Sequence, residues 1–168
     1  METLNQFLNR KDFVKYLKNK DFDRNIDKII LHHTSDEVRD WKGNQSILGY
    51  KKMYEDKGWI SGPHLFIAPE GIYLFTDINI QGIHANDGNK GSIGIEMVGN
   101  YDDSFPNNHI WKNTELVLIN LLIKFNLKIK DIHFHREYNN QKSCPGRAVT
   151  KREIRERLIK SILNLKTF

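Results

Sequence analysis

The chain has 168 residues and a mass of 19.8 kDa, which is the size of one domain. Apolar residues make up 39% of it and aromatic residues 11%, so the chain can bury a core, and a disordered chain is excluded. The single cysteine, Cys144, excludes a disulfide framework, Cys-rich zinc fingers and iron–sulfur clusters. No apolar run approaches the ~20 residues of a membrane span.

The two ends of the chain differ in charge. The first residues lack the basic start and the long apolar run of a secretory signal, so we expect a protein made in the cytoplasm without a signal peptide. The net charge of +5 is concentrated in residues 151–168, which contain six basic and two acidic residues. Such a segment is typical of a surface that binds an anionic polymer, and also of a solvated helix face. Phe168 is its only aromatic residue, which disfavours a nucleic-acid module.

Apolar periodicity predicts the secondary structure in chain order. Helices are expected at residues 12–20, 46–56 and 113–125 and after residue 150, and strands at 28–32, 64–68, 72–75, 92–98 and 131–135. Asn113 is the expected cap of the third helix, and Thr150 with Glu153 forms the capping box of the last.

The alternation of strands and helices predicts an α/β fold with a single mixed β-sheet flanked by helices. No linker or repeat interrupts it, so residues 1–168 are expected to form one domain, with a helical extension over 1–24 and a basic helix over 150–168.

Two histidines and the cysteine have the spacing of a metal site. His133 and His135 share one face of a predicted strand, Cys144 follows nine residues after His135, and His32 ends another strand. Two imidazoles and a thiolate leave one tetrahedral position open, as in a hydrolytic zinc site. By spacing alone, scattered structural histidines remain the alternative, and His133 is an alternative ligand to His135.

Two further interpretations of these residues are weaker. A blue-copper centre also uses two histidines and a cysteine, but it needs a nearby methionine, and none follows Cys144. A papain-like nucleophile is disfavoured because Pro145 removes the N–H that would help to bind an oxyanion.

Five short segments occur in order along the chain: IILHHTS at 29–35, GPHLFIAPEG at 62–71, GIHANDG at 82–88, SIGIEMVGN at 92–100 and HREYNNQKSCPG at 135–146. Together they resemble the zinc-dependent N-acetylmuramoyl-L-alanine amidases of the type-2 amidase family, to which the peptidoglycan recognition proteins also belong. The resemblance spans Ile29 to Gly146, and five ordered matches are specific where one would not be. It implies a type-2 amidase-like fold.

The resemblance also implies a role for each matching residue. The expected Zn²⁺ ligands are His32, His135 and Cys144. Lys142 matches the lysine that stabilises the oxyanion, and Glu96 matches the general base of the recycling-type branch. Many phage-type members have a tyrosine where this chain has Pro63, so Glu96 is interpreted as the replacement base. His84 and Asn86 match substrate-contacting positions, although His84 could equally be a turn histidine.

The implied reaction is hydrolysis of the amide bond between N-acetylmuramic acid and the L-alanine of the peptidoglycan stem peptide. We expect a phage or prophage endolysin, a bacteriolytic enzyme that reaches the cell wall through a membrane hole made by a holin-type protein. The basic carboxy-terminal helix would then dock on an anionic wall polymer. A cytoplasmic muropeptide-recycling amidase and a non-catalytic peptidoglycan-binding protein are the alternatives.

Overall fold

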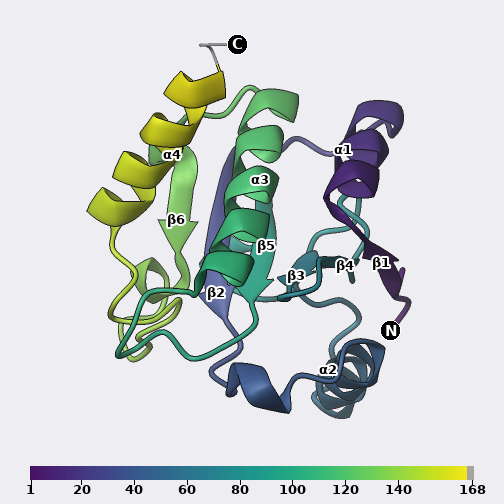
Figure 1. Ribbon diagram of the computed structural model, residues 1–168. Coiled ribbons are helices and arrows are strands. Elements are labelled where there is room, and N and C mark those ends of the chain that lie inside the picture. Colours follow the sequence, from purple (N-terminus) through teal and green to yellow (C-terminus); the bar gives the residue numbers. More distant parts are fainter. Residues whose placement is uncertain (166–168) are drawn as a thin grey trace.

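The computed structural model describes residues 1–165, within which six strands form one mixed sheet (Figure 1). The strands are β1 (Gln6–Leu8), β2 (Lys28–His33), β3 (Leu65–Ile67), β4 (Ile72–Leu74), β5 (Ser92–Met97) and β6 (Ile132–Phe134). Their order across the sheet is β1-β4-β3-β5-β2-β6. β2 pairs in parallel with β5 and β6, β3 pairs in parallel with β5, and the pairs β3–β4 and β1–β4 are antiparallel.

The helices are α1 (Arg10–Asn19), α2 (Asn44–Asp56), α3 (Asn108–Lys124) and α4 (Lys151–Leu165). Figure 1 shows α3 in front of β2 and β5, with α4 and α1 on either side of it, while α2 lies below the carboxyl ends of β2 and β5. The structure therefore confirms the predicted α/β fold with a mixed sheet and flanking helices. No helix within the described residues is long and apolar enough to cross a membrane.

The third helix begins earlier than the sequence predicted. It starts at Asn108 and is capped by Asn107, whose side chain accepts hydrogen bonds from the backbone N–H groups of His109 and Ile110. Asn113, the expected cap, is instead buried inside the helix. Its amide donates to the carbonyl of Ala68 (2.7 Å) and accepts from Nε of Arg10 (2.7 Å), so a tertiary role explains this asparagine.

The amino-terminal segment contributes a strand that the sequence did not indicate. β1 has three residues and pairs antiparallel with β4 at the edge of the sheet. A strand of three residues is too short to show a period of two, so its pairing partner alone defines it.

The last helix begins as the sequence predicted. Oγ1 of Thr150 accepts a hydrogen bond from the backbone N–H of Glu153 (3.1 Å), and Ile154 and Leu158 are buried in the core. The carboxylate of Glu153 pairs with Arg157 (2.8 Å) rather than closing a capping box. The expected continuation of the helix over 166–168, with Lys166 and Phe168, lies outside the described residues.

The register of the parallel strands positions the candidate site. His32 lies directly opposite Glu96 across the β2–β5 pair, and Leu31 lies opposite Phe134 across the β2–β6 pair. Because neighbouring parallel strands end at the same edge of a sheet, the residues that end β2 and follow β6 meet there. Ile93, Ile95 and Met97 enter the hydrophobic core, so Glu96 projects to the opposite face, as the alternating pattern predicted.

Candidate metal centre and cleft

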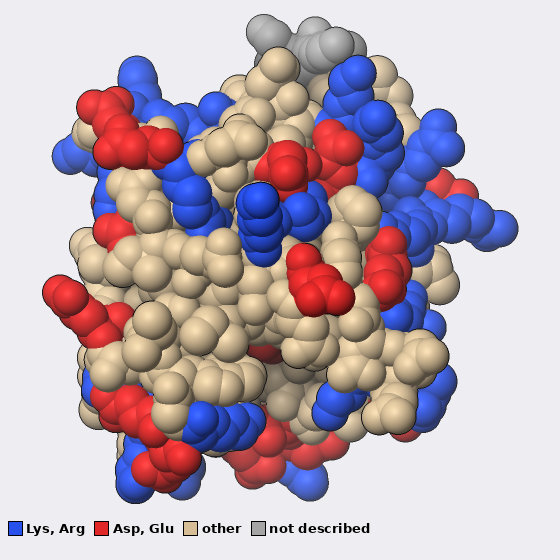
Figure 2. Space-filling model, turned by 180° about the vertical axis from the view of Figure 1, so that it is seen from behind, with Lys and Arg blue, Asp and Glu red and all other residues tan. Residues whose placement is uncertain are grey.

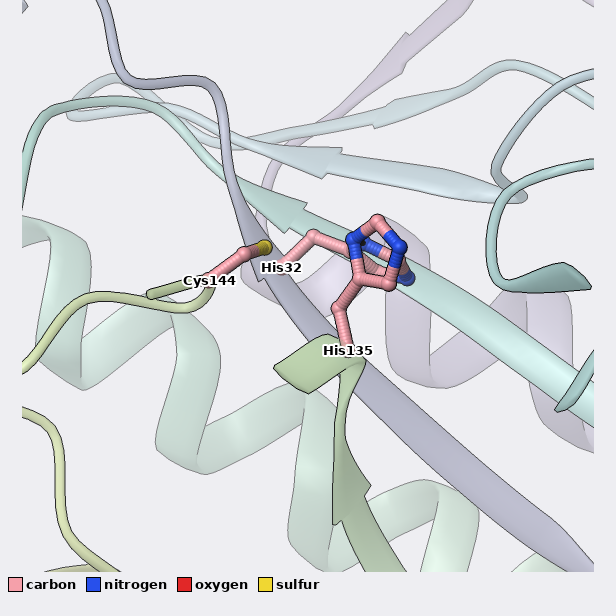
Figure 3. Close-up of side chains that lie close together, drawn as sticks. All are labelled: His32, His135 and Cys144. Carbon is pink, nitrogen blue, oxygen red and sulfur yellow. Dashed lines mark hydrogen bonds between the residues drawn. The ribbon is translucent and has the colours of Figure 1, made fainter. Parts of the chain in front are cut away.

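Three metal-ligand side chains converge at the carboxyl edge of the sheet. His32 comes from β2, His135 follows β6 directly, and Cys144 lies in the loop beyond it (Figure 3). Their ligand atoms all lie within 4.8 Å of one another, and Nδ1 of His32 is 3.1 Å from Nδ1 of His135. Two nitrogens that share a tetrahedral zinc ion stand about 3.3 Å apart, given Zn–N bonds of ≈ 2.0–2.1 Å. The donor set and its spacing therefore fit Zn²⁺.

Local backbone structure explains why His135 rather than His133 joins the cluster. The strand ends at Phe134, and a 3₁₀ turn begins at His135, so the alternation of faces stops between the two histidines. His133 instead pairs through Nδ1 with Glu137 (3.3 Å) and lies against the ring of Tyr138.

Burial controls the protonation of the three candidate ligands. It lowers the pKa of His32 well below its usual value, and the neighbouring His135 lowers it further. Burial, and then Lys142, also lowers the pKa of His135, so both imidazoles are held in the neutral form that binds metals. Burial and Glu96 raise the pKa of Cys144. A nucleophilic cysteine needs a lowered pKa, so the raised pKa of this thiol disfavours a role in attack on a carbonyl.

Glu96 lies beside the cluster with one oxygen unpaired. Its Oε1 is 3.8 Å from Nδ1 of His32, while Oε2 is buried and has no hydrogen-bond partner among the described residues. Burial, with a smaller contribution from Asp36, raises the pKa of this carboxyl to about 8. A carboxyl group of this kind can gain and lose a proton near neutral pH, which is what a general base requires.

A cleft of about 470 Å³ opens onto these groups. Lys142 and Asn86 line it together with the three candidate ligands and Glu96. Its aromatic wall includes Tyr54 and Trp59, whose rings stack with centroids 5.3 Å apart. Figure 2 shows that the molecule is hollowed in the lower half of the face opposite α3. The cleft is therefore lined both by aromatic rings and by titratable groups.

His84, which the resemblance matched to a substrate-contacting position, has both ring nitrogens close to other protein groups. It also lines the cleft, yet it is only 8% exposed, and its Nδ1 is 2.9 Å from Nε2 of His32. Its Nε2 is 3.2 Å from Oγ of Ser92. Both ring nitrogens are thus engaged within the protein, whereas Asn86 is exposed at the rim of the cleft.

The sequence did not point to Arg136, which holds the loop that carries Cys144. Its guanidinium donates to the carbonyls of Ser143 (3.0 Å), Gly146 (2.8 Å) and Val149 (2.7 Å). The backbone N–H of Arg136 donates to the carbonyl of Cys144 (3.0 Å), which ties the loop to the end of β6. The signal available in the sequence was an arginine directly after a candidate ligand. A guanidinium carries five N–H donors in a fixed geometry and can therefore bond several backbone carbonyls at once.

Comparison with known proteins agrees with this geometry. Residues 22–147 match the type-2 amidase family, described as N-acetylmuramoyl-L-alanine amidase. The endolysin N-acetylmuramoyl-L-alanine amidase LysCS from Clostridium intestinale has a similar structure, with a TM-score of 0.69 and 26% identity. That similarity covers 80% of this chain and 84% of LysCS.

Two peptidoglycan recognition protein structures share the fold at lower identity. PGRP-LB from Drosophila has a TM-score of 0.66 at 20% identity, with 77% of this chain and 79% of PGRP-LB covered. The ectodomain complex of PGRP-LCa and PGRP-LCx, bound to tracheal cytotoxin, has a TM-score of 0.65 at 20% identity, with 77% and 81% covered. No curated protein sequence matches this chain.

Replacing Arg136 should loosen the loop that carries Cys144. We expect Arg136→Met to lower the free energy of unfolding by about 1.5–3 kcal/mol, because carbonyls bonded to a charged donor lose it. Amide hydrogen exchange at Gly146 and Val149 should accelerate at least about tenfold, since each tenfold corresponds to about 1.4 kcal/mol.

The matched control is Arg147→Met. The Arg147 side chain is 69% exposed, and its guanidinium makes an ion pair with Asp102 at 3.7 Å. We expect a change within about 0.5 kcal/mol. Equal losses in urea denaturation of the two variants would contradict the anchoring role of Arg136.

Proposed function

The chain belongs to the N-acetylmuramoyl-L-alanine amidase family, and we propose that it hydrolyses the amide bond between N-acetylmuramic acid and the L-alanine of the stem peptide. The observation that carries this proposal is the convergence of His32, His135 and Cys144 in one cleft with Glu96 and Lys142. The three candidate ligands, the candidate base Glu96 and the ammonium group of Lys142 come from distant parts of the chain. A purely structural core would not require this combination.

His32, His135 and Cys144 would hold the zinc ion. When bound there, zinc acts as a Lewis acid toward the amide carbonyl and lowers the pKa of water, and it also favours the thiolate form of the cysteine. Both histidines are already held neutral by burial, so they require no proton loss before they bind a cation.

Glu96 and Lys142 would carry the proton and charge movements. The buried Oε2 of Glu96 accepts the proton of the attacking water and delivers it to the leaving amide nitrogen, which must depart as an amine. Lys142 lines the cleft beside His135, where its ammonium group can stabilise the oxygen that becomes negative in the transition state. One such donor typically contributes about 2.7–4 kcal/mol.

An endolysin is the setting that the relatives favour. LysCS, at 26% identity, is described as an endolysin amidase. A cytoplasmic muropeptide-recycling amidase would share the cleft but act on soluble fragments, so the preference for intact wall over fragments separates the two. A non-catalytic peptidoglycan-binding protein is the second candidate function, and the presence of Cys144, Lys142 and both histidines counts against it.

Helix α4 would contribute the docking surface for an anionic wall polymer. Figure 2 shows Lys and Arg gathered along the right-hand edge, where α4 lies in this reversed view. Several of these cations are already engaged: Lys151 pairs with Glu137, Arg152 with Glu156, and Arg157 lies over the ring of Phe105. Arg155 and Lys160 are exposed, and no ion pair holds either within residues 1–165, so they would provide the attraction.

The central test is digestion of purified cell wall. We expect the protein to release new L-alanine amino termini from intact glycan strands and to lose this activity with a chelator. Cys144→Ala and His135→Ala should lose zinc and at least about 1,000-fold of the rate together, because the metal supplies several kcal/mol of transition-state stabilisation. His109→Ala, an exposed histidine on α3, should keep both. Binding of wall without release of amino termini would support the non-catalytic alternative.

Replacing Glu96 should separate metal binding from turnover. Glu96→Gln keeps the shape of the side chain but cannot accept the proton, so zinc content should stay unchanged while kcat falls about 100- to 10,000-fold. Glu115→Gln on α3, whose carboxylate accepts a hydrogen bond from Ser161, is the matched control and should keep full activity. An unchanged kcat in Glu96→Gln would show that another group is the base.

Reversing the exposed charges of α4 should weaken wall binding alone. We expect the double variant Arg155→Glu with Lys160→Glu to sediment less with purified wall at low salt, while hydrolysis of a soluble muropeptide is unchanged. The difference from wild type should vanish at about 1 M salt, where the Debye length is about 3 Å. Wall binding that ignores both the reversal and the salt would exclude the docking role.

A further inference from the structure

The His84 ring is fully engaged inside the protein. Its Nδ1 lies 2.9 Å from Nε2 of His32, and its Nε2 lies 3.2 Å from Oγ of Ser92. The two rings meet edge to face, with centroids 5.0 Å apart and planes at 85°. A histidine that uses both nitrogens in this way has none left for a ligand in the cleft unless one of these bonds breaks.

The hydrogen bond that Ser92 donates determines which groups donate and which accept in the bonds of His84 and His32. The hydroxyl of Ser92 donates to the carbonyl of Asn89 (2.9 Å), so its oxygen is left to accept from the Nε2–H of His84. A neutral imidazole carries one proton, so Nδ1 of His84 is an acceptor, and Nε2 of His32 must donate to it. Nδ1 of His32, the atom 3.1 Å from Nδ1 of His135, is then the nitrogen with a free lone pair.

The fold provides a close-fitting site for the His84 ring. A Cβ atom at Gly94 would lie 2.6 Å from Cδ2 of His84, and one at Gly82 would lie 2.9 Å from the same atom. The side chain of Asn89 accepts from the backbone N–H groups of His84 (2.9 Å) and Ala85 (2.7 Å), which fixes the backbone beside the ring. The ring orientation is therefore set by backbone on two sides and by hydrogen bonds at both nitrogens.

We propose that His84 is a positioning residue of the metal centre, which holds His32 in the Nε2–H tautomer and turns its Nδ1 toward the cation. This inference rests on the metal site of the proposed function, and it assigns to His84 a role other than substrate contact. The hydrogen-bonded partner of a metal-binding histidine fixes its tautomer and ring orientation, and losing such a partner typically costs about 10- to 100-fold in metal affinity.

Zinc affinity, measured by competition with a chromophoric chelator, tests this role without reference to amidase activity. His84→Leu removes the acceptor, and we expect zinc affinity to fall about 10- to 100-fold. His84→Asn places an amide oxygen near the position of Nδ1, so it should accept from His32 and retain affinity within about threefold of wild type. Rescue by Asn but not by Leu would separate a hydrogen-bond role from simple packing.

His64→Leu is the matched control. His64 is fully buried, and the centroid of its ring lies 5.8 Å from that of the His84 ring. Its Nδ1 accepts from the backbone N–H of Gly94 (2.9 Å), and its Nε2 bonds the carbonyl of Ile80 (3.0 Å), so it makes no bond to His32. We expect this variant to be less stable toward urea but to bind zinc within about threefold of wild type.

The outcomes are distinct. Wild-type zinc affinity in His84→Leu, or an equal loss in His64→Leu, would overturn the positioning role while leaving the metal site intact. A wild-type protein that binds no zinc would overturn the proposed function and this inference together. If His84→Leu does not fold, ¹⁵N NMR of the zinc-loaded wild type tests the proposal instead. A proton on Nε2 of both His32 and His84 would support the positioning role of His84. A proton on Nδ1 of His84 would overturn it.

Discussion

The parallel pairing of β2 with β5 and β6 is the constraint on which the candidate site depends. It places His32 opposite Glu96 and brings the first residue after β6 beside the end of β2. Side chains that are up to 103 residues apart in the chain thereby face one another across strand spacings of about 5 Å. The main hydrophobic core holds this register, because a slip of one residue in β5 would turn Glu96 into the core and Ile95 into the cleft.

Burial gives this edge of the sheet its chemistry. It keeps His32 and His135 neutral, raises the pKa of the Cys144 thiol and raises that of Glu96 to about 8. A divalent cation would interact favourably with these side chains, since neutral imidazoles and a thiolate are its ligands. His84 and Arg136 extend the arrangement outward: His84 bonds His32, and Arg136 ties the Cys144 loop to the end of β6. The candidate metal centre is thus held in place by residues that are not themselves among its three candidate ligands.

Much of the fold followed from local pattern. The strands around His32 and Glu96, helix α2 and the hairpin at Pro69-Glu70-Gly71 were predicted from periodicity and turn residues, because each signal is contained within a few neighbouring residues. The start of α3 was wrong, because Asn107 and Asn113 have the same capping chemistry and only the contacts of Asn113 with Ala68 and Arg10 distinguish them. Strand β1 was not predicted, because three residues are too few to show the two-residue alternation of a strand.

The sequence by itself determined the alternation of strands and helices, the apolar faces and, through five ordered segments, the family to which the chain belongs. Only the tertiary structure decided which histidines meet. His133 and His135 are two residues apart, yet the turn that begins at His135 sends the two side chains to different partners. His84 lies 52 residues from His32, and nothing local predicts the bond between them. Such contacts depend on strand order and on the room that Gly94 leaves for a ring, and a sequence encodes these only through the fold as a whole.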